Sequence, residues 1–201
     1  MADTDTPVHE LATPYLNKWG SYQFTRDEID ASKIRYFCEV AEDANPMYWD
    51  EEFASKSRFG RLIAPPQGLR TFTFGSFWQP DYVRDRTRDD AARLSGESPS
   101  SDSGAEAQMG GVMGLARERG YDTVTVTSTE AEYLSPFGPN EGRIKQRTMT
   151  TQVSEEKQTR VGRGIFITNI TEYRTENDDR LIGRLTMVLL NYRPKSSEDE
   201  G

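Results

Sequence analysis

The residues that could do chemistry gather in residues 41–54, which read AEDANPMYWDEEFA. Asp43, Asn45 and Tyr48 supply a carboxyl group, an amide and a phenol within a few positions. A carboxylate can accept a proton and a phenol can donate one, so the cluster holds groups suited to acid–base chemistry. The chain has one histidine, His9, far away in the sequence.

Neither His9 nor Tyr48 is a convincing base. His9 lies in a polar segment with two prolines, residues 1–20, which we interpret as a tail that nothing in the sequence anchors. Tyrosine has an ordinary pKa near 10, so it is a poor base at neutral pH without strong perturbation. The cluster alone therefore looks incomplete for chemistry that needs both an acid and a base.

The elements that position the cluster can be predicted from local patterns. Thr25 and Glu28 have the spacing of a capping box, and the apolar positions after them indicate a helix over about 26–42. Pro46 should end that helix, which places the cluster on the turn that leaves it. A short helix is expected at 49–60, and a second, apolar nearly all round, should begin at Pro65 and Pro66.

The rest of the chain divides into two regions of different amino-acid composition. Residues 79–118 are rich in Ser, Gly and charge, and we interpret them as an insertion, partly mobile, with short helices at its ends. Four antiparallel strands are expected at 122–134, 142–157, 161–175 and 180–193 because of their β-branched residues, with a shorter strand or turn at 19–24. The last strand is apolar on both faces, so it should lie centrally in the sheet.

Composition limits the classes of protein. A chain of 201 residues suits one domain, here residues 21–193 with an acidic tail at 194–201. A net charge of -8 opposes binding to nucleic acid. Cys38 is the only cysteine and lies in an apolar run, where a buried thiol in a cytoplasmic protein is expected. No signal peptide, membrane span, metal-site or phosphate-loop pattern is visible.

This order of elements, helices and then long antiparallel strands, is expected of an α+β hot-dog fold, an antiparallel sheet wrapped around a central helix. The stretch FCEVAEDANPMYWDEEFASKSRFGRLIAPPQGL resembles the front of a MaoC-like enoyl-CoA hydratase or acyl dehydratase, and the likeness continues more weakly through 121–193. Asp43, Asn45 and Pro46 match the motif of that family. Tyr48 stands where the family has its catalytic histidine, and Pro66 stands where it has a glycine whose N–H polarises the thioester carbonyl.

The departures matter because hydration of an enoyl thioester needs a base, an acid and a donor to the enolate oxygen, and proline has no N–H. The chain resembles the N-terminal halves and non-catalytic subunits of this family, of the FAS1-like dehydratase type. The resemblance implies a second hot-dog subunit that carries the Asp/His pair. It also implies a 2-enoyl-CoA substrate, whose acyl group could be bulky, such as a steroid side chain, and no cofactor. The substrate-binding positions it implies are Arg58, Arg61, Ala64, Pro65, Pro66, Gly68, Phe72, Phe77 and Trp78.

Simpler interpretations stay open for these residues. Asp43 could be an active carboxylate, a strut or a residue that closes a helix. The basic residues Lys56, Arg58 and Arg61 could meet the phosphates of coenzyme A or form a solvated face. The aromatic residues Phe72, Phe74, Phe77 and Trp78 could line an acyl tunnel or only pack. Two other functions remain: a homo-oligomeric acyl-CoA thioesterase that uses Asp43 without histidine, and a non-catalytic acyl-CoA or lipid-binding module.

Overall fold

The computed structural model describes residues 6–74, 78, 80–85 and 104–195. The helical elements are α1 (Val8–Leu11), η1 (Thr13–Tyr15), α2 (Ala31–Ala41), α3 (Pro46–Trp49), α4 (Glu51–Ser55), η2 (Pro66–Gly68), α5 (Leu69–Thr73) and α7 (Gly104–Glu118). The strands are β1 (Gln23–Phe24), β2 (Thr123–Tyr133), β3 (Ile144–Val153), β4 (Lys157–Thr159), β5 (Gly162–Thr175) and β6 (Leu181–Pro194). The four long predicted strands are thus confirmed.

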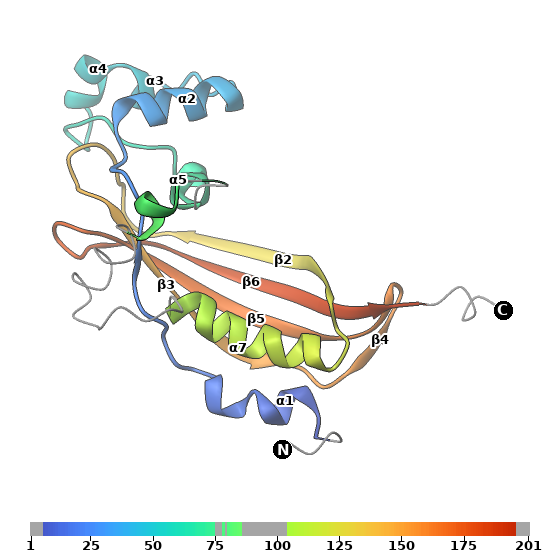
Figure 1. Cartoon of the computed structure of the whole chain (residues 1–201). Helices are drawn as coiled ribbons and strands as arrows, with labels where there is room; N and C mark the ends of the chain where they lie inside the picture. Colours follow the sequence, from blue (N-terminus) through green and yellow to red (C-terminus); the bar gives the residue numbers. More distant parts are fainter. Residues whose placement is uncertain (1–5, 75–77, 79, 86–103, 196–201) are drawn as a thin grey trace.

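One antiparallel sheet forms the body of the molecule (Figure 1). Its strand order is β1-β3-β5-β6-β2, and β4 pairs with the start of β5. The central position expected for the apolar strand β6 is confirmed, because it pairs with β5 on one side and β2 on the other. β2 does not pair with β3, the next strand in sequence, and instead forms the edge beyond β6.

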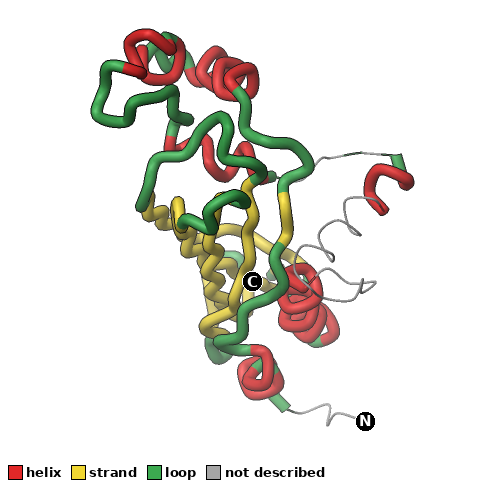
Figure 2. The backbone as a smooth tube through the Cα atoms, turned by 90° about the vertical axis from the view of Figure 1, so that its left-hand side faces the viewer, coloured by secondary structure: helices red, strands yellow, loops and turns green. Residues whose placement is uncertain are grey.

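Two apolar clusters lie on the helix-facing side of the sheet, which we call the inner face. The upper cluster joins α2, α3 and α5 to one end of the sheet through buried residues that include Ile34, Cys38, Tyr48, Leu69 and Ile182. The lower cluster joins α1 and α7 to the other end through Val8, Ala12, Val112, Ala116, Ile165 and Ile167. Figure 2 shows α7 on one side of the curved sheet, with α2 to α4 beyond its upper end. This is the hot-dog arrangement predicted from the sequence.

The helix predicted to begin at Pro65 and Pro66 is present, but it is short. η2 and α5 together run only from Pro66 to Thr73, and Phe74 and Trp78 beyond them are 60% and 80% exposed. The long helix on the inner face is α7, 15 residues within the segment interpreted as an insertion. Short helices were predicted at the ends of that segment, and α7 at its C-terminal end is longer than predicted. Gly111 of α7 lets the ring of Tyr15 approach closely.

α2 begins later than predicted. Asp30, rather than Thr25, caps it by accepting a hydrogen bond from Lys33 N–H at 2.8 Å. The helix ends at Glu42 in a left-handed conformation, before Pro46, and Pro46 instead starts α3. The start of α2 is set by a side-chain cap that local spacing did not identify, whereas its end, predicted at about 42, is set by the left-handed backbone of Glu42.

The expected polar tail is partly anchored. Val8 and Ala12 are buried against α7, so α1 lies at the lower end of the sheet (Figure 1). His9 on α1 is therefore at the opposite end of the molecule from α3. Within the described ranges, no helix is long and apolar enough to cross a membrane.

The outer face of the sheet carries a buried charge near β1. Glu172 is 3% exposed and accepts hydrogen bonds from Arg147 Nε at 2.7 Å, Arg174 Nε at 3.2 Å and the Tyr22 hydroxyl at 3.2 Å. Arg147 also lies over the rings of Trp19 and Tyr22. These contacts join residues 19–24 to β3 and β5 and close that edge of the sheet.

Candidate functional site

The motif loop between α2 and α3 is held by its own polar side chains. Asn45 caps α3, its Oδ1 accepting the Met47 N–H at 3.1 Å, and Pro46 is the first helical residue. Asp43 Oδ1 accepts the Asn45 N–H at 3.1 Å. The indole N–H of Trp49 donates to the Asp43 carbonyl oxygen at 2.7 Å. Much of what the motif does in this chain is therefore to shape a turn.

Asp43 also has one longer-range partner. Gln67 Nε2, from η2, donates to Asp43 Oδ2 at 3.4 Å. Asp43 is partly exposed, so its carboxylate is held at the surface of the loop with two donors already on it. Gln67 is a residue that sequence reasoning did not single out, although it lies inside the quoted APPQGL run.

Tyr48 points into the upper cluster and is 8% exposed. Burial raises the pKa of its phenol above the ordinary value of 10.0, and the nearby Asp43 carboxylate raises the pKa further. Burial, followed by the Asp43 charge, likewise raises the pKa of the Cys38 thiol. Both groups are therefore protonated at neutral pH, and neither can act there as a base or as a thiolate nucleophile.

The position expected to polarise a thioester is occupied by a proline. Pro66 is the first residue of η2, where a missing N–H costs the helix nothing. A catalytic relative would need an N–H at this point to hold the enolate oxygen. The loop thus offers a carboxylate, Asp43, but neither a base–acid couple nor the expected backbone donor.

The substrate-binding residues predicted after the motif fall into two groups. Ala64, Pro65 and Gly68 are buried, and the Ala64 N–H donates to the Phe137 carbonyl at 2.7 Å. Phe72 packs between Phe37 and Phe137, with ring centroids 5.3 Å and 6.2 Å away. Gly68 must be small because a Cβ there would lie 2.6 Å from the Phe72 ring. Trp78 is 80% exposed, and Phe77 lies outside the described residues.

The basic residues do not form one patch. Lys56 pairs with Glu52 at 2.5 Å on an exposed face, and Arg58 lies over the ring of Phe59, 4.6 Å from its centroid. Arg61 Nη2 instead donates to Glu141 Oε1 at 2.6 Å. Of the three, Arg61 also lines a pocket.

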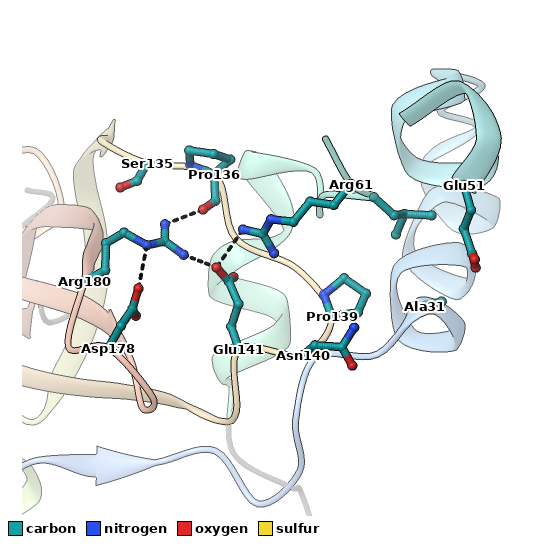
Figure 3. A pocket seen from close by; sticks show the side chains of 11 residues that line it. Ala31, Glu51, Arg61, Ser135, Pro136, Pro139, Asn140, Glu141, Asp178 and Arg180 are labelled. Atoms are coloured by element: carbon teal, nitrogen blue, oxygen red, sulfur yellow. Dashed lines mark hydrogen bonds and ion pairs between the residues drawn. The ribbon is translucent and has the colours of Figure 1, made fainter. Parts of the chain in front are cut away.

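That pocket, of about 830 Å³, lies between α2, α4 and the loops at the upper end of the sheet (Figure 3). Glu141 stands at its centre and also pairs with Arg180, which in turn donates to the Pro136 carbonyl at 2.5 Å and to Asp178 at 3.2 Å. Three carboxylates, Glu51, Glu141 and Asp178, and the two guanidinium groups of Arg61 and Arg180 line the pocket. The pocket therefore has no net positive charge with which to attract the phosphates of a nucleotide.

Glu141 and Arg180 were not found by sequence reasoning, because each sits in a loop and only the fold brings them together. Metal chemistry has no visible basis in the described ranges, where no group of three or more His, Cys, Asp or Glu side chains could hold an ion. The roles of the predicted site residues stay predictions.

Comparison with known proteins identifies what this arrangement resembles. A family model described as a FAS1-like, dehydratase domain region matches residues 20–98, which include the motif loop, η2 and α5. A probable enoyl-CoA hydratase alpha subunit from Thermomonospora curvata is 27% identical over 173 residues. That match covers 86% of this chain and 48% of the relative, so the chain spans about half the length of the curated protein it matches.

Solved structures agree on the fold. The ChsH1-ChsH2 complex from Mycobacterium tuberculosis contains a chain that matches with a TM-score of 0.73 at 20% identity, covering 94% of this chain and 93% of that one. A structure described as a MaoC-like dehydratase matches with a TM-score of 0.51 at 14% identity, covering 90% of this chain and 43% of that one. At these identities the likeness supports the hot-dog fold.

Proposed function

We propose that this chain, which carries a FAS1-like dehydratase region on a MaoC-like hot-dog fold, is the substrate-binding subunit of a heteromeric enoyl-CoA hydratase. In this proposal it holds a 2-enoyl-CoA thioester, and a second hot-dog subunit provides the Asp/His pair that adds water. The chain alone is then inactive. Coenzyme A enters only as part of the substrate, and no further cofactor takes part.

One observation carries the proposal. The residue at the histidine position of the motif, Tyr48, is buried in the upper cluster with a raised pKa, while Asn45 and Pro46 keep their places in the turn. Hydration needs a group that takes a proton from water near neutral pH, and Tyr48 cannot be that group. The motif loop has the capped turn formed by Asn45 and Pro46 but no catalytic base at position 48. This is expected of a subunit whose partner carries out the hydration.

The free edge of the sheet supports a second subunit. All but the first of the 11 residues of β2 are exposed, and among the described residues no strand pairs with its outer edge. The strand sequence TVTVTSTEAEY contains no Lys, Arg or Pro, the residues that usually protect such an edge. Val124, Val126 and Tyr133 are 38%, 52% and 49% exposed. We infer that the partner sheet docks along β2.

The short length of α5 favours a bulky acyl group in the proposed substrate. α5 has five residues and is separated along the inner face from α7, so one continuous helix does not fill the described part of that face. A bulky acyl group, such as a steroid side chain that carries its rigid fused rings, would need such room. This part of the proposal concerns substrate size and is tested separately from catalysis.

The decisive experiment measures hydration of a 2-enoyl-CoA by loss of the enoyl absorbance. The chain is assayed alone, then with a co-expressed hot-dog protein that is encoded beside it and carries the full Asp and His motif, then with that partner's histidine replaced. We expect activity only in the intact pair. Activity of the chain alone would overturn the proposal, and release of free thiol from saturated acyl-CoA would favour a thioesterase instead.

A variant of the motif loop sharpens the test. Tyr48→Phe should leave the activity of the pair within about threefold, because the phenol is not used, whereas removing a general acid or base costs about a hundredfold or more. Tyr36→Phe is the matched control, since Tyr36 is 66% exposed on α2. A hundredfold loss in Tyr48→Phe alone would show that the phenol does chemistry.

A further inference from the structure

A single carboxylate at the upper end of the sheet joins three separate segments of the chain. Glu141 lies in the loop between β2 and β3, and its Oε1 accepts hydrogen bonds from Arg61 Nη2 at 2.6 Å and from Arg180 Nη2. Its Oε2 accepts the Gly138 N–H of its own loop at 2.7 Å. Arg61 follows α4 and Arg180 immediately precedes β6, so these bonds connect parts of the chain that are far apart in the sequence (Figure 3).

This carboxylate is partly buried and its second arginine is fixed in turn. The side chain of Glu141 is 14% exposed, so solvent screens its bonds less than those of a surface pair. Arg180 also donates to the Pro136 carbonyl oxygen at 2.5 Å and to Asp178 at 3.2 Å. Arg180 therefore fixes the position of Glu141, and Glu141 fixes the position of Arg61.

The segment 61–64 lies between α3 and the β2–β3 loop. The Ile63 N–H donates to the Met47 carbonyl oxygen of α3 at 3.4 Å, and the Ala64 N–H donates to the Phe137 carbonyl oxygen of the loop at 2.7 Å. The last three residues of the segment are buried. Its position therefore depends on the loop that carries the carboxylate as well as on α3.

Gly138 lets the β2–β3 loop approach this segment closely. A Cβ at position 138 would lie 2.8 Å from the Leu62 carbonyl oxygen and 3.2 Å from Ile63 Cα. Both distances are too short for an ordinary contact with backbone atoms, so a side chain here would push the loop and the segment apart. The loop and the segment 61–64 thus pack as one unit, with Glu141 and Arg61 bonded across it.

The position of this segment determines the surroundings of two parts of the candidate site. Arg61 and Leu62 line the pocket of about 830 Å³, and η2 follows the segment at Pro66. Gln67 of η2 donates to the carboxylate of Asp43 in the motif loop. A displacement of the segment would therefore move one wall of the pocket together with η2.

We propose that Glu141 is a positioning residue for substrate binding, which fixes the segment 61–64 through Arg61 and is itself held by Arg180. This inference rests on the proposed function, because it assumes that the chain holds the 2-enoyl-CoA against the pocket wall and η2. The partner subunit carries out the hydration, so loss of Glu141 should weaken substrate binding and leave the chemical step unchanged.

The test measures KM and kcat of the intact pair with a 2-enoyl-CoA. Glu141→Ala should raise KM about tenfold and change kcat by less than about twofold, because it removes binding that the substrate and the transition state share. Gly138→Ala displaces the same segment without removing a charge, so it should also raise KM. A KM that stays within about twofold in both variants would overturn this inference and leave the proposed function intact. A pair that hydrates no 2-enoyl-CoA would overturn both.

Glu176→Ala is the matched control. Glu176 accepts hydrogen bonds from Arg143 Nη2 at 2.9 Å and Nε at 3.2 Å, and this pair joins the β2–β3 loop to the β5–β6 turn without Arg61. The side chain of Glu176 is 24% exposed. The control should lower the urea midpoint of unfolding about as much as Glu141→Ala does, with KM unchanged. An equal rise in KM would mean that loosening of the loops is the cause, and would contradict the role of Glu141.

Two further variants separate positioning from a general loss of stability. Glu141→Gln keeps the shape and one acceptor oxygen, so it should raise KM less than Glu141→Ala. If Glu141 acts through Arg61, the double variant Arg61→Ala with Glu141→Ala should have the KM of Arg61→Ala alone, within about twofold. Independent effects would instead multiply, and that result would show that Glu141 does not act through Arg61.

Discussion

The two edges of the sheet are built in opposite ways. At the β1 edge, the aromatic rings of Trp19 and Tyr22 and the buried Glu172 tie the N-terminal segment to β3 and β5. At the β2 edge, exposed threonines, valines and glutamates face solvent along 11 residues. The chain therefore closes one edge of the sheet with its own residues, and under the proposed function the other edge accepts the second subunit.

The largest expected effect tests the closed edge. Glu172→Ala leaves Arg147 and Arg174 without their shared carboxylate. We expect the free energy of unfolding to fall by about 2–3 kcal/mol, below the full value for a buried pair because both arginines are partly exposed. Glu132→Ala, on the exposed β2, should change it by less than about 0.5 kcal/mol. Urea unfolding measures the free energy of unfolding of both variants. Equal decreases in the two would contradict the difference between the two edges.

The open edge is tested by charge. Val126→Lys with Ala131→Lys should leave the unfolding free energy of the isolated chain within about 0.5 kcal/mol, because both side chains are exposed. The affinity for the partner hot-dog subunit should fall by about tenfold or more, since lysines on an edge oppose strand addition. Val161→Lys, at a 39% exposed position away from β2, is the matched control. Unchanged affinity in the double variant would place the partner elsewhere.

Acid should weaken the closed edge first. Burial alone would raise the pKa of Glu172, but the hydrogen bonds and charges of Arg147 and Arg174 outweigh it and hold the pKa below the ordinary 4.5. A carboxyl group with a lowered pKa in the folded state stabilises it above the unfolded-state value near 4.5, and this contribution is lost as the pH falls through the folded-state value. The free energy of unfolding, measured from pH 6 downward, should therefore decrease below about pH 5. In Glu172→Gln this decrease should be smaller.

The smallest effect compares one substitution at two strands. Thr148→Val removes the hydrogen bond with Thr171 on the inner face and should cost about 1 kcal/mol. Thr125→Val on β2 removes a hydroxyl that faces solvent, so its effect on the isolated chain should be near zero. Thermal unfolding of both variants at one pH resolves the difference. A larger loss at Thr125 would mean that β2 is already engaged in the chain alone.

Much of the fold could be predicted from the sequence because the strands carry their own signal. β-branched residues and turn residues placed the four long strands within a few positions, and the two-sided apolar pattern located β6 at the centre. A short helix was predicted at the end of the segment where α7 lies, but its length of 15 residues and its burial were not. Gly and Ala give this helix little apolar pattern, although Val112 and Ala116 are fully buried. The order of strands, with β2 beyond β6, depends on long-range packing that no local pattern encodes.

The motif loop was predictable because its contacts are local. Asp43 and Asn45 lie on the turn between α2 and α3, and Tyr48 lies in α3 itself, so their proximity follows from spacing alone. The partner of Asp43, Gln67, and the Glu141–Arg180 pair come together only through the fold. The burial of Tyr48 was equally invisible, since an aromatic residue in such a loop could point either way.

The way Asn45 and Pro46 cap α3 has a consequence for evolution. Asn45 and Pro46 start α3 whatever residue stands at position 48, so under the proposed function selection for folding alone would retain them in a chain that does not catalyse. The side chain of Tyr48, at the fourth position of the motif, does not cap the helix, and its large ring packs into the upper cluster. Under the same proposal, a search that scores only the aspartate, asparagine and proline of this motif would count non-catalytic subunits together with enzymes, and the residue at the position of Tyr48 would separate them.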